Sequence, residues 1–110
     1  MAIAIGAENF RDFLAGARAM DEHFCTALPA QNLPMQLALA GIWNRNFLHM
    51  PTHLIVPYAS RLVRFTPFVQ QMDMESNGKH THIDGTPATV DTGPIVWGGL
   101  GIDGQHAYFQ

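Results

Sequence analysis

The segment from Met35 to Phe47 is apolar on almost every side of a helix, and this limits the folds open to the chain more than any other feature. Leu37, Leu39 and Ile42 would point in different directions around the helix axis instead of forming one stripe. A helix that is apolar on all faces is normally buried inside a protein. Pro34 suits the first turn of such a helix. We therefore predict a buried helix over residues 35–47.

The composition makes such a helix hard to bury within this chain alone. The chain has 110 residues, of which 47% are hydrophobic and only 14% are charged, whereas about 25% are charged in a typical soluble domain. A small domain also has proportionally more surface to solvate than a large one. We expect part of its apolar surface to pack on protein outside the chain or on a partner subunit.

Charge and cysteine content exclude several classes of partner. The net charge is −3 and the few Lys and Arg residues are scattered, so no basic face for nucleic acid or for a membrane surface is expected. Cys25 is the single cysteine, so no internal disulfide can form, which fits a reducing compartment. The chain has no signal-peptide pattern at its start, and no apolar run approaches the roughly 18 residues of a membrane span.

Hydrophobic periodicity predicts the main elements. Apolar residues recur every third or fourth position from Asn9 to Thr26, which indicates an amphipathic helix with Asn9 as its cap. Short apolar runs at 53–58 and 95–97 are typical of buried strands. Between them, Leu62 to Met72 restores the helical period, with Pro67 as a predicted kink or break.

The second half of the chain is rich in turn signals. Asn77-Gly78 and Asp84-Gly85 predict a small hairpin made of residues 79–83 and 86–90. A glycine-rich loop at 98–104 precedes a predicted helix that begins at Gln105. Six helical residues without a cap are too few to be stable in water. We therefore expect these 110 residues to be a piece of a longer protein.

Two local motifs have both a functional and a plainer interpretation. Residues 99–104 (GLGIDG) match the G-x-G-x-x-G of a dinucleotide site in the right context. The acidic residue expected about 20 positions later lies beyond the chain, and a chance match is the alternative. His80 and His82 would share one face of a strand and could form a metal pair. No further ligand pattern completes a zinc site, and a solvated hairpin edge is the simpler interpretation.

Glu75 and His106 are the candidates for acid–base chemistry. Histidine titrates near neutrality, and burial can tune a glutamate to the same range. Taken singly, Glu75 could be a solvated carboxylate before a turn, and His106 a capping or core histidine at the start of a helix. Their spacing along the chain does not show whether they meet.

Several segments together resemble the glucose-6-phosphate isomerase family, in order and over nearly the whole chain. The most specific are residues 74–79 (MESNGK) and residues 92–98 (TGPIVWG). The others are residues 20–24 (MDEHF), 32–34 (NLP), 39–44 (LAGIWN), 52–53 (TH), 57–58 (PY), 70–71 (QQ) and 104–107 (GQHA).

The resemblance implies a fold and a domain plan. Family members have two sugar isomerase domains, each an α/β domain with a parallel sheet flanked by helices. Residues 1–28 would be a connecting helical segment, and residues 29–110 the amino-terminal part of the second sugar isomerase domain. The right-handed crossover rule supports parallel pairing of the two predicted strands.

The resemblance also implies a reaction without a cofactor or metal. The family interconverts glucose 6-phosphate and fructose 6-phosphate by ring opening and proton transfer through a cis-enediol. Glu75 matches the base, Gln71 a glutamine near the substrate, and His106 a ring-opening histidine that reaches the neighbouring subunit's site in a homodimer. The resemblance also implies a cytoplasmic location. Alternatives from other classes are a non-catalytic sugar-phosphate-binding module of the same fold and a nucleotide-binding module built on the glycine loop.

Some positions depart from the family pattern, and some of its functional groups lie outside the chain. Most members have Glu-Pro at Gly99-Leu100, Asp-Gln at Ala59-Ser60 and Gln at Asp91. The family's enediolate-stabilising arginine and most of its phosphate site match positions before this segment, and a second ring-opening lysine matches a position after it. Since electrostatic stabilisation is often the largest catalytic term, we expect the 110 residues alone to be inactive.

Overall fold

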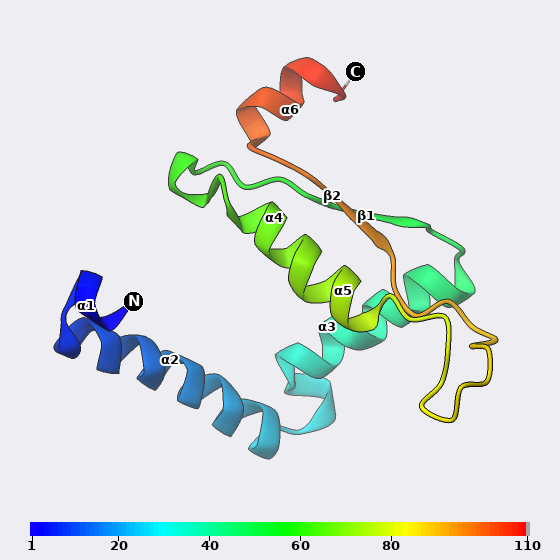
Figure 1. Ribbon diagram of the computed structural model, residues 1–110, viewed down its shortest axis with the longest axis horizontal. Helices are drawn as coiled ribbons and strands as arrows, with labels where there is room; N and C mark the ends of the chain where they lie inside the picture. Colours follow the sequence, from blue (N-terminus) through cyan, green and yellow to red (C-terminus); the bar gives the residue numbers. More distant parts are fainter. Residues whose placement is uncertain (110) are drawn as a thin grey trace. The chain divides into compact units, whose positions relative to one another are not determined.

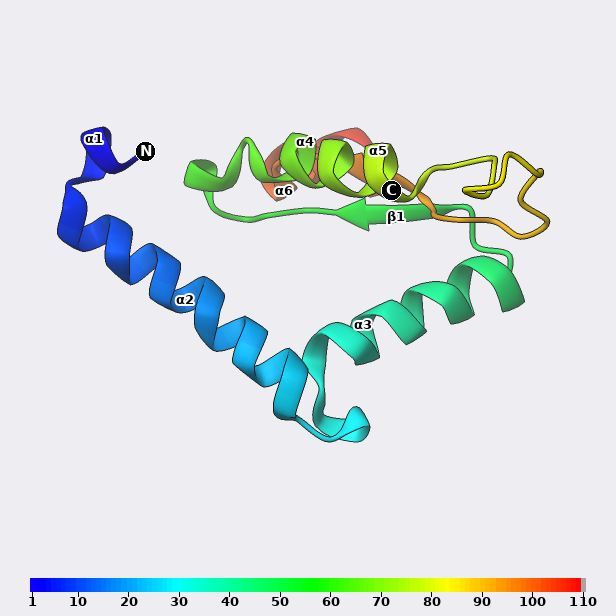
Figure 2. The same ribbon diagram turned by 60° about the horizontal axis from the view of Figure 1, so that its bottom comes forward.

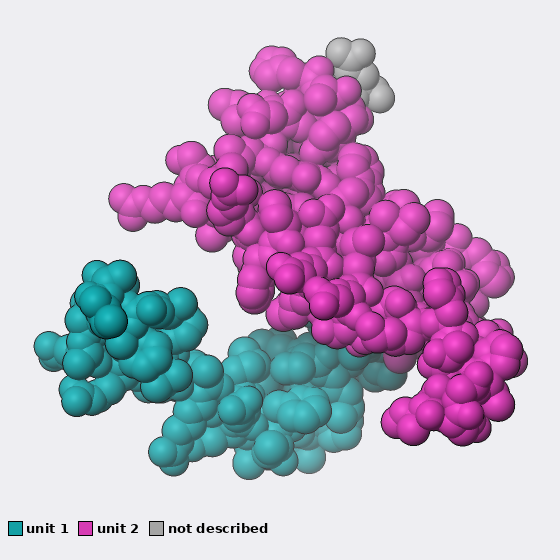
Figure 3. Space-filling view, viewed as in Figure 1, with its two compact units in different colours: residues 1–40 teal, residues 41–110 magenta. Residues whose placement is uncertain are grey.

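The computed structural model describes residues 1–109, which divide into two units. The first comprises Met1–Ala40 and the second Gly41–Gln110, shown in teal and magenta in Figure 3. Each unit has its own set of contacts. The division into residues 1–28 and 29–110 rests on the family's domain plan and stays a prediction.

The first unit contains the predicted amphipathic helix. Helix α2 spans Ala7–Thr26 and follows a short helix α1, Ala2–Ile5 (Figure 1). The predicted cap is wrong, because Gly6 precedes α2 and Asn9 lies within its first turn. The Asn9 side chain instead donates to Ile5 O at 2.8 Å. It therefore joins α2 to the preceding turn.

Asn32 organises the corner between α2 and helix α3, Leu33–Ile42. Its side chain is 1% exposed. Asn32 Nδ2 donates to Phe24 O at 2.8 Å, and Asn32 Oδ1 accepts from Met35 N at 3.1 Å. The second bond satisfies a free N–H at the start of α3, as a capping side chain does. His23 Nε2 also accepts from Leu33 N at 3.1 Å.

The helix predicted over residues 35–47 is present, but the prediction that it is buried is wrong for the described residues. Helix α3 passes into a π-helical turn, Trp43–Phe47. Leu37, Leu39 and Trp43 are 69%, 53% and 56% exposed. The all-round apolar pattern indicates burial, but 110 residues supply too little protein to cover every face of the helix.

The second unit contains a two-stranded parallel sheet. Strand β1, Thr52–Ile55, pairs in parallel with β2, Ile95–Gly98, in a register that places Thr52 opposite Ile95. Both predicted strands and their parallel pairing are therefore confirmed, although β1 ends at Ile55 and Val96 is the one strand residue that is buried. The fold class is α/β with flanking helices. Figure 2 shows α4 (Phe65–Val69) and α5 (Glu75–Asn77) over one face of the sheet.

The crossover between the strands is helical and has no break at Pro67. After a 3-10 turn, Ser60–Leu62, helix α4 leads through a π-helical turn, Gln70–Met74, directly into α5. Pro67 is the third residue of α4, where its missing N–H has no helical acceptor to lose. The predicted kink is thus wrong. The irregular part of this helix is the π turn.

The segment between α5 and β2 is a turn with little strand structure. Thr81 and Pro87 form one antiparallel bridge, so the predicted hairpin is only partly correct. Asp84 Oδ1 accepts from both Thr86 N and Thr86 Oγ1, at 3.0 and 2.7 Å. The side-chain bond from Thr86, followed by the backbone bond, holds the pKa of Asp84 below its usual range.

Gly98 ends β2 in a conformation that few other residues adopt. Its φ is 127°, and a Cβ there would meet the Ile55 carbonyl group, with the carbonyl carbon at 3.0 Å. We expect Gly98→Ala to lower the free energy of unfolding by about 3 kcal/mol through backbone strain and this clash. Gly99→Ala is the matched control, because nothing lies within 4 Å of a Cβ at Gly99. Denaturant unfolding of the full-length protein measures both, and equal midpoints would contradict the prediction.

Candidate functional site

Glu75 opens α5 immediately after the π turn. Its side chain is exposed. The following turn is held in place by Lys79 Nζ, which donates to Glu75 O, and by Asn77 Nδ2, which donates to Asp73 Oδ1 at 2.6 Å. These bonds fix the backbone around Glu75, and no hydrogen bond or ion pair within residues 1–109 engages its carboxylate. A free carboxylate on an ordered helix can act as a base if a substrate reaches it.

Gln71 lies four residues before Glu75, within the π turn. Residues four apart occupy the same face of a helix. The Gln71 side chain is exposed like that of Glu75. The structure thus brings these two predicted residues to one face of the same helical segment.

His106 lies on a different element, away from Glu75. Helix α6 spans Gly101–Ala107, so it begins four residues before the predicted start and has His106 in its last turn. The prediction that His106 starts a helix is wrong. Figure 1 shows α5 beside the beginning of β2 and α6 beyond the end of the same strand. Glu75 and His106 therefore lie at opposite ends of β2.

The glycine-rich loop is used for internal packing. A Cβ at Gly101 would lie 2.5 Å from the Tyr58 ring, and one at Gly104 would lie 2.7 Å from the Tyr108 hydroxyl. Gly101 N, at the start of α6, donates to Pro57 O at 2.9 Å. These glycines allow two tyrosines to approach the helix, which explains the motif without a bound phosphate.

A cavity of about 330 Å³ lies where the two strands end. It is lined by Pro57, Tyr58, Ser60, Leu100, Gly101, Ile102 and Gln105. In open α/β sheets, ligands bind beyond the carboxyl ends of the strands. Its lining includes the family departures Ser60 and Leu100. Sequence reasoning did not predict this cavity, although the two strand ends were a usable signal.

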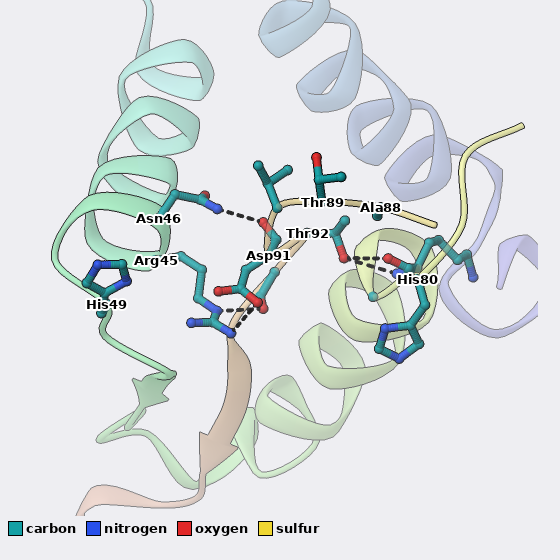
Figure 4. A pocket seen from close by; sticks show the side chains of 12 residues that line it. Arg45, Asn46, His49, His80, Ala88, Thr89, Asp91 and Thr92 are labelled. Atoms are coloured by element: carbon teal, nitrogen blue, oxygen red, sulfur yellow. Dashed lines mark hydrogen bonds and ion pairs between the residues drawn. The ribbon is translucent and has the colours of Figure 1, made fainter. Parts of the chain in front are cut away.

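A more polar cavity of about 490 Å³ lies at the other end of the sheet. Figure 4 shows Arg45 and Asn46 reaching from the end of the α3 segment to Asp91. Arg45 Nη2 pairs with Asp91 Oδ1 at 2.9 Å, and Asn46 Nδ2 donates to Asp91 O at 2.9 Å. In sequence, Asp91 was notable only as a departure from the family. In the structure its carboxylate joins the loop before β2 to Arg45.

Thr92 extends this attachment to the segment after Glu75. Thr92 Oγ1 accepts from Lys79 N at 3.1 Å and donates to Lys79 O at 3.0 Å. The same cavity is lined by His49 and His80. Within residues 1–109 no three His, Cys, Asp or Glu side chains gather closely enough to hold a metal ion, so His80 and His82 gain no further ligand. No helix in this described range is both long and apolar enough to cross a bilayer.

Comparisons with known proteins agree on one family. The family model described as phosphoglucose isomerase matches residues 1–110. A glucose-6-phosphate isomerase of Cupriavidus metallidurans is 54% identical over the whole chain, and one of Agrobacterium fabrum is 56% identical over 98% of it. In each case the chain covers 20% of the relative, so it spans about a fifth of the length of the relatives it matches.

Solved structures agree with the sequence matches. A crystal structure of a glucose-6-phosphate isomerase from Chlamydia trachomatis superposes with a TM-score of 0.88 at 45% identity, covering 96% of this chain and 20% of that one. A hypothetical protein from Thermus thermophilus gives a TM-score of 0.67 at 30% identity, covering 86% of this chain and 20% of that one.

Proposed function

The chain belongs to the phosphoglucose isomerase family, and on this premise we propose that the longer protein containing it interconverts glucose 6-phosphate and fructose 6-phosphate. The observation that carries the proposal is the family match over all 110 residues, which includes the segment around Glu75. On this proposal the enzyme works in glycolysis and gluconeogenesis in the cytoplasm. A single cysteine suits that reducing compartment.

Glu75 is the proposed base of the isomerisation. A carboxylate can take a proton from C2 of the open-chain sugar and return it to C1, provided that water is kept out of the pocket. Gln71 shares the helix face of Glu75, and we assign it a contact with the substrate. Support comes from the ordered backbone on both sides of Glu75 and from its free carboxylate. The surrounding protein would exclude water from the carboxylate.

His106 is the proposed ring-opening group, and it serves the neighbouring subunit of a homodimer. The place of α6 beyond the end of β2, away from α5, supports this assignment (Figure 1), because one copy of this segment then carries the two residues on separate helices. Twofold symmetry would give each site Glu75 from one subunit and His106 from the other. The proposed site thus consists of groups from two copies of the same segment.

The exposed apolar surface supports the view that this segment is one layer of a larger domain. Val96 is the one apolar side chain fully buried among the described residues, while Leu37, Trp43 and Phe68 are each more than half exposed. Within each unit, large apolar side chains that are exposed in this number usually mark surface that another part of a protein covers. We assign residues 29–110 to the second sugar isomerase domain, whose remaining helices and strands would cover these side chains.

Activity should require the full-length polypeptide. We expect it to interconvert the two sugar phosphates, whereas the 110-residue segment shows no turnover, because the family's arginine and most of its phosphate site match positions outside the segment. Formation of glucose 6-phosphate from fructose 6-phosphate, followed with a coupled dehydrogenase, measures both. Turnover by the clean segment would refute the expectation for the segment. Sugar-phosphate binding without turnover by the full-length protein would instead indicate a non-catalytic binding module.

A further inference from the structure

We propose that Gln70 is a positioning residue for Glu75, acting through its hydrogen bond to Val96 in the neighbouring strand. The proposal rests on the proposed role of Glu75 and adds a residue that the family comparison does not assign. Gln70 and Met74 are the first and last residues of the π turn, and Glu75 follows directly.

Both ends of the π turn are attached to the same buried residue. Gln70 Nε2 donates to Val96 O at 3.0 Å, and Val96 N donates to Met74 Sδ at 3.4 Å. Val96 is 1% exposed and Gln70 is partly buried. The two bonds span the turn from end to end. They fix its length and rotation relative to β2.

The attachment also satisfies the main chain of β2. Ile95 N donates to Pro51 O on the side of β1, so the polar groups of the next residue, Val96, point to the opposite side of the strand. A buried N–H or C=O without a partner costs about 1–3 kcal/mol. The side chains of Gln70 and Met74 supply partners for both groups. Loss of the Gln70 donor therefore has two effects. It removes a restraint on the helix, and it leaves the Val96 carbonyl oxygen of β2 without this hydrogen-bond donor.

The π turn determines the direction of the Glu75 side chain. A π turn closes with an i→i+5 bond and so includes one more residue than an α turn. Relaxation to a regular α turn would rotate Glu75 by about 100° relative to α4, the angle between successive residues of an α-helix. With Glu75 turned away in this manner the enzyme would still fold, but the carboxylate would no longer face the sugar proton that it is proposed to remove. π turns occur frequently at functional sites.

Gln70→Met in the full-length enzyme tests the proposal, since it keeps side-chain length and removes the donor. We expect kcat to fall about 10- to 100-fold with KM little changed, as small misplacements of a catalytic group do. We also expect the limb of the pH–rate profile that reports Glu75 to move. Met74→Leu, which removes the sulfur acceptor, should move both quantities in the same direction by less.

Gln36→Met is the matched control. Gln36 Nε2 also donates to a main-chain oxygen, Pro29 O, at 2.8 Å, but on a helix that does not contain Glu75. We expect its kcat and pH profile to equal those of the wild type. An unchanged kcat in Gln70→Met would overturn the proposal. So would a loss proportional to the fraction of unfolded protein, with the pH limb unmoved.

The proposed function can fail separately from this positioning role. An inactive wild-type full-length protein, or an undiminished kcat in Glu75→Gln, would contradict the assignment of the base. If the wild type is active and Glu75→Gln is impaired, a fully active Gln70→Met would remove only the positioning role of Gln70.

Discussion

Replacing Glu75 with glutamine in the full-length enzyme lowers kcat by about 10²- to 10⁴-fold, the usual contribution of a general base. Glutamine keeps the size and much of the hydrogen-bonding capacity of the carboxylate but cannot accept the proton from the sugar. KM should stay within about threefold, because the change removes an interaction made mainly in the transition state. The measurement is the steady-state rate in both directions of the isomerisation.

Glu8→Gln is the control for this experiment. Glu8 is also an exposed glutamate on a helix, like Glu75. The two substitutions therefore remove the same charge from exposed helical positions. We expect Glu8→Gln to retain wild-type kcat. A Glu75→Gln enzyme with undiminished kcat would show that another group moves the proton.

Mixing two inactive variants restores activity if His106 serves the neighbouring subunit. Glu75→Gln and His106→Ala homodimers each lack one group in every site. In a hybrid dimer one site carries both defects and the other carries none. Since about half of randomly mixed subunits form hybrids of a twofold dimer, we expect about a quarter of wild-type activity.

The measurement is activity after the two variants are dissociated together and reassembled, or produced together in one cell. Each variant treated alone is the control. If Glu75 and His106 served the same subunit, every site in every mixture would keep one defect, and no activity would return. That result would contradict the homodimer assignment of His106 without affecting that of Glu75.

Hydrophobic periodicity predicted where the helices and strands lie. It did not predict the start of α2 or the undisturbed helix at Pro67, which depend on local backbone contacts. The helix ending at Thr26 and the strands near Leu54 and Val96 have strong apolar patterns, and all are present. Asn9 has a capping side chain, but Gly6 before it already ends the preceding turn, so α2 begins earlier. Pro67 disrupts a helix only where its N–H would be needed, and it stands in the first turn.

The hydrogen bonds that position the site residues could not be predicted from the sequence, because the two partners of each bond are far apart along the chain. Gln70 and Val96 are 26 residues apart, and Asn46 and Asp91 are 45 apart. No local pattern relates such residues, since a hydrogen bond depends on the position of two atoms in space. Asn32 is a partial exception, because an asparagine shortly before Pro34 is itself a local signal for the start of a helix.

The sequence by itself determined the family and the candidate residues. Glu75, Gln71 and His106 are recognised by their places in ordered, specific segments, and that recognition needs no coordinates. Only the tertiary structure shows which of these residues lie on the same part of the fold. It sets Gln71 and Glu75 on one helix segment attached to Val96, and His106 on a helix beyond the other end of β2. The physical reason is that parallel strands alternate with helices that run back across the sheet, so the order of residues along the chain does not give their separation in space.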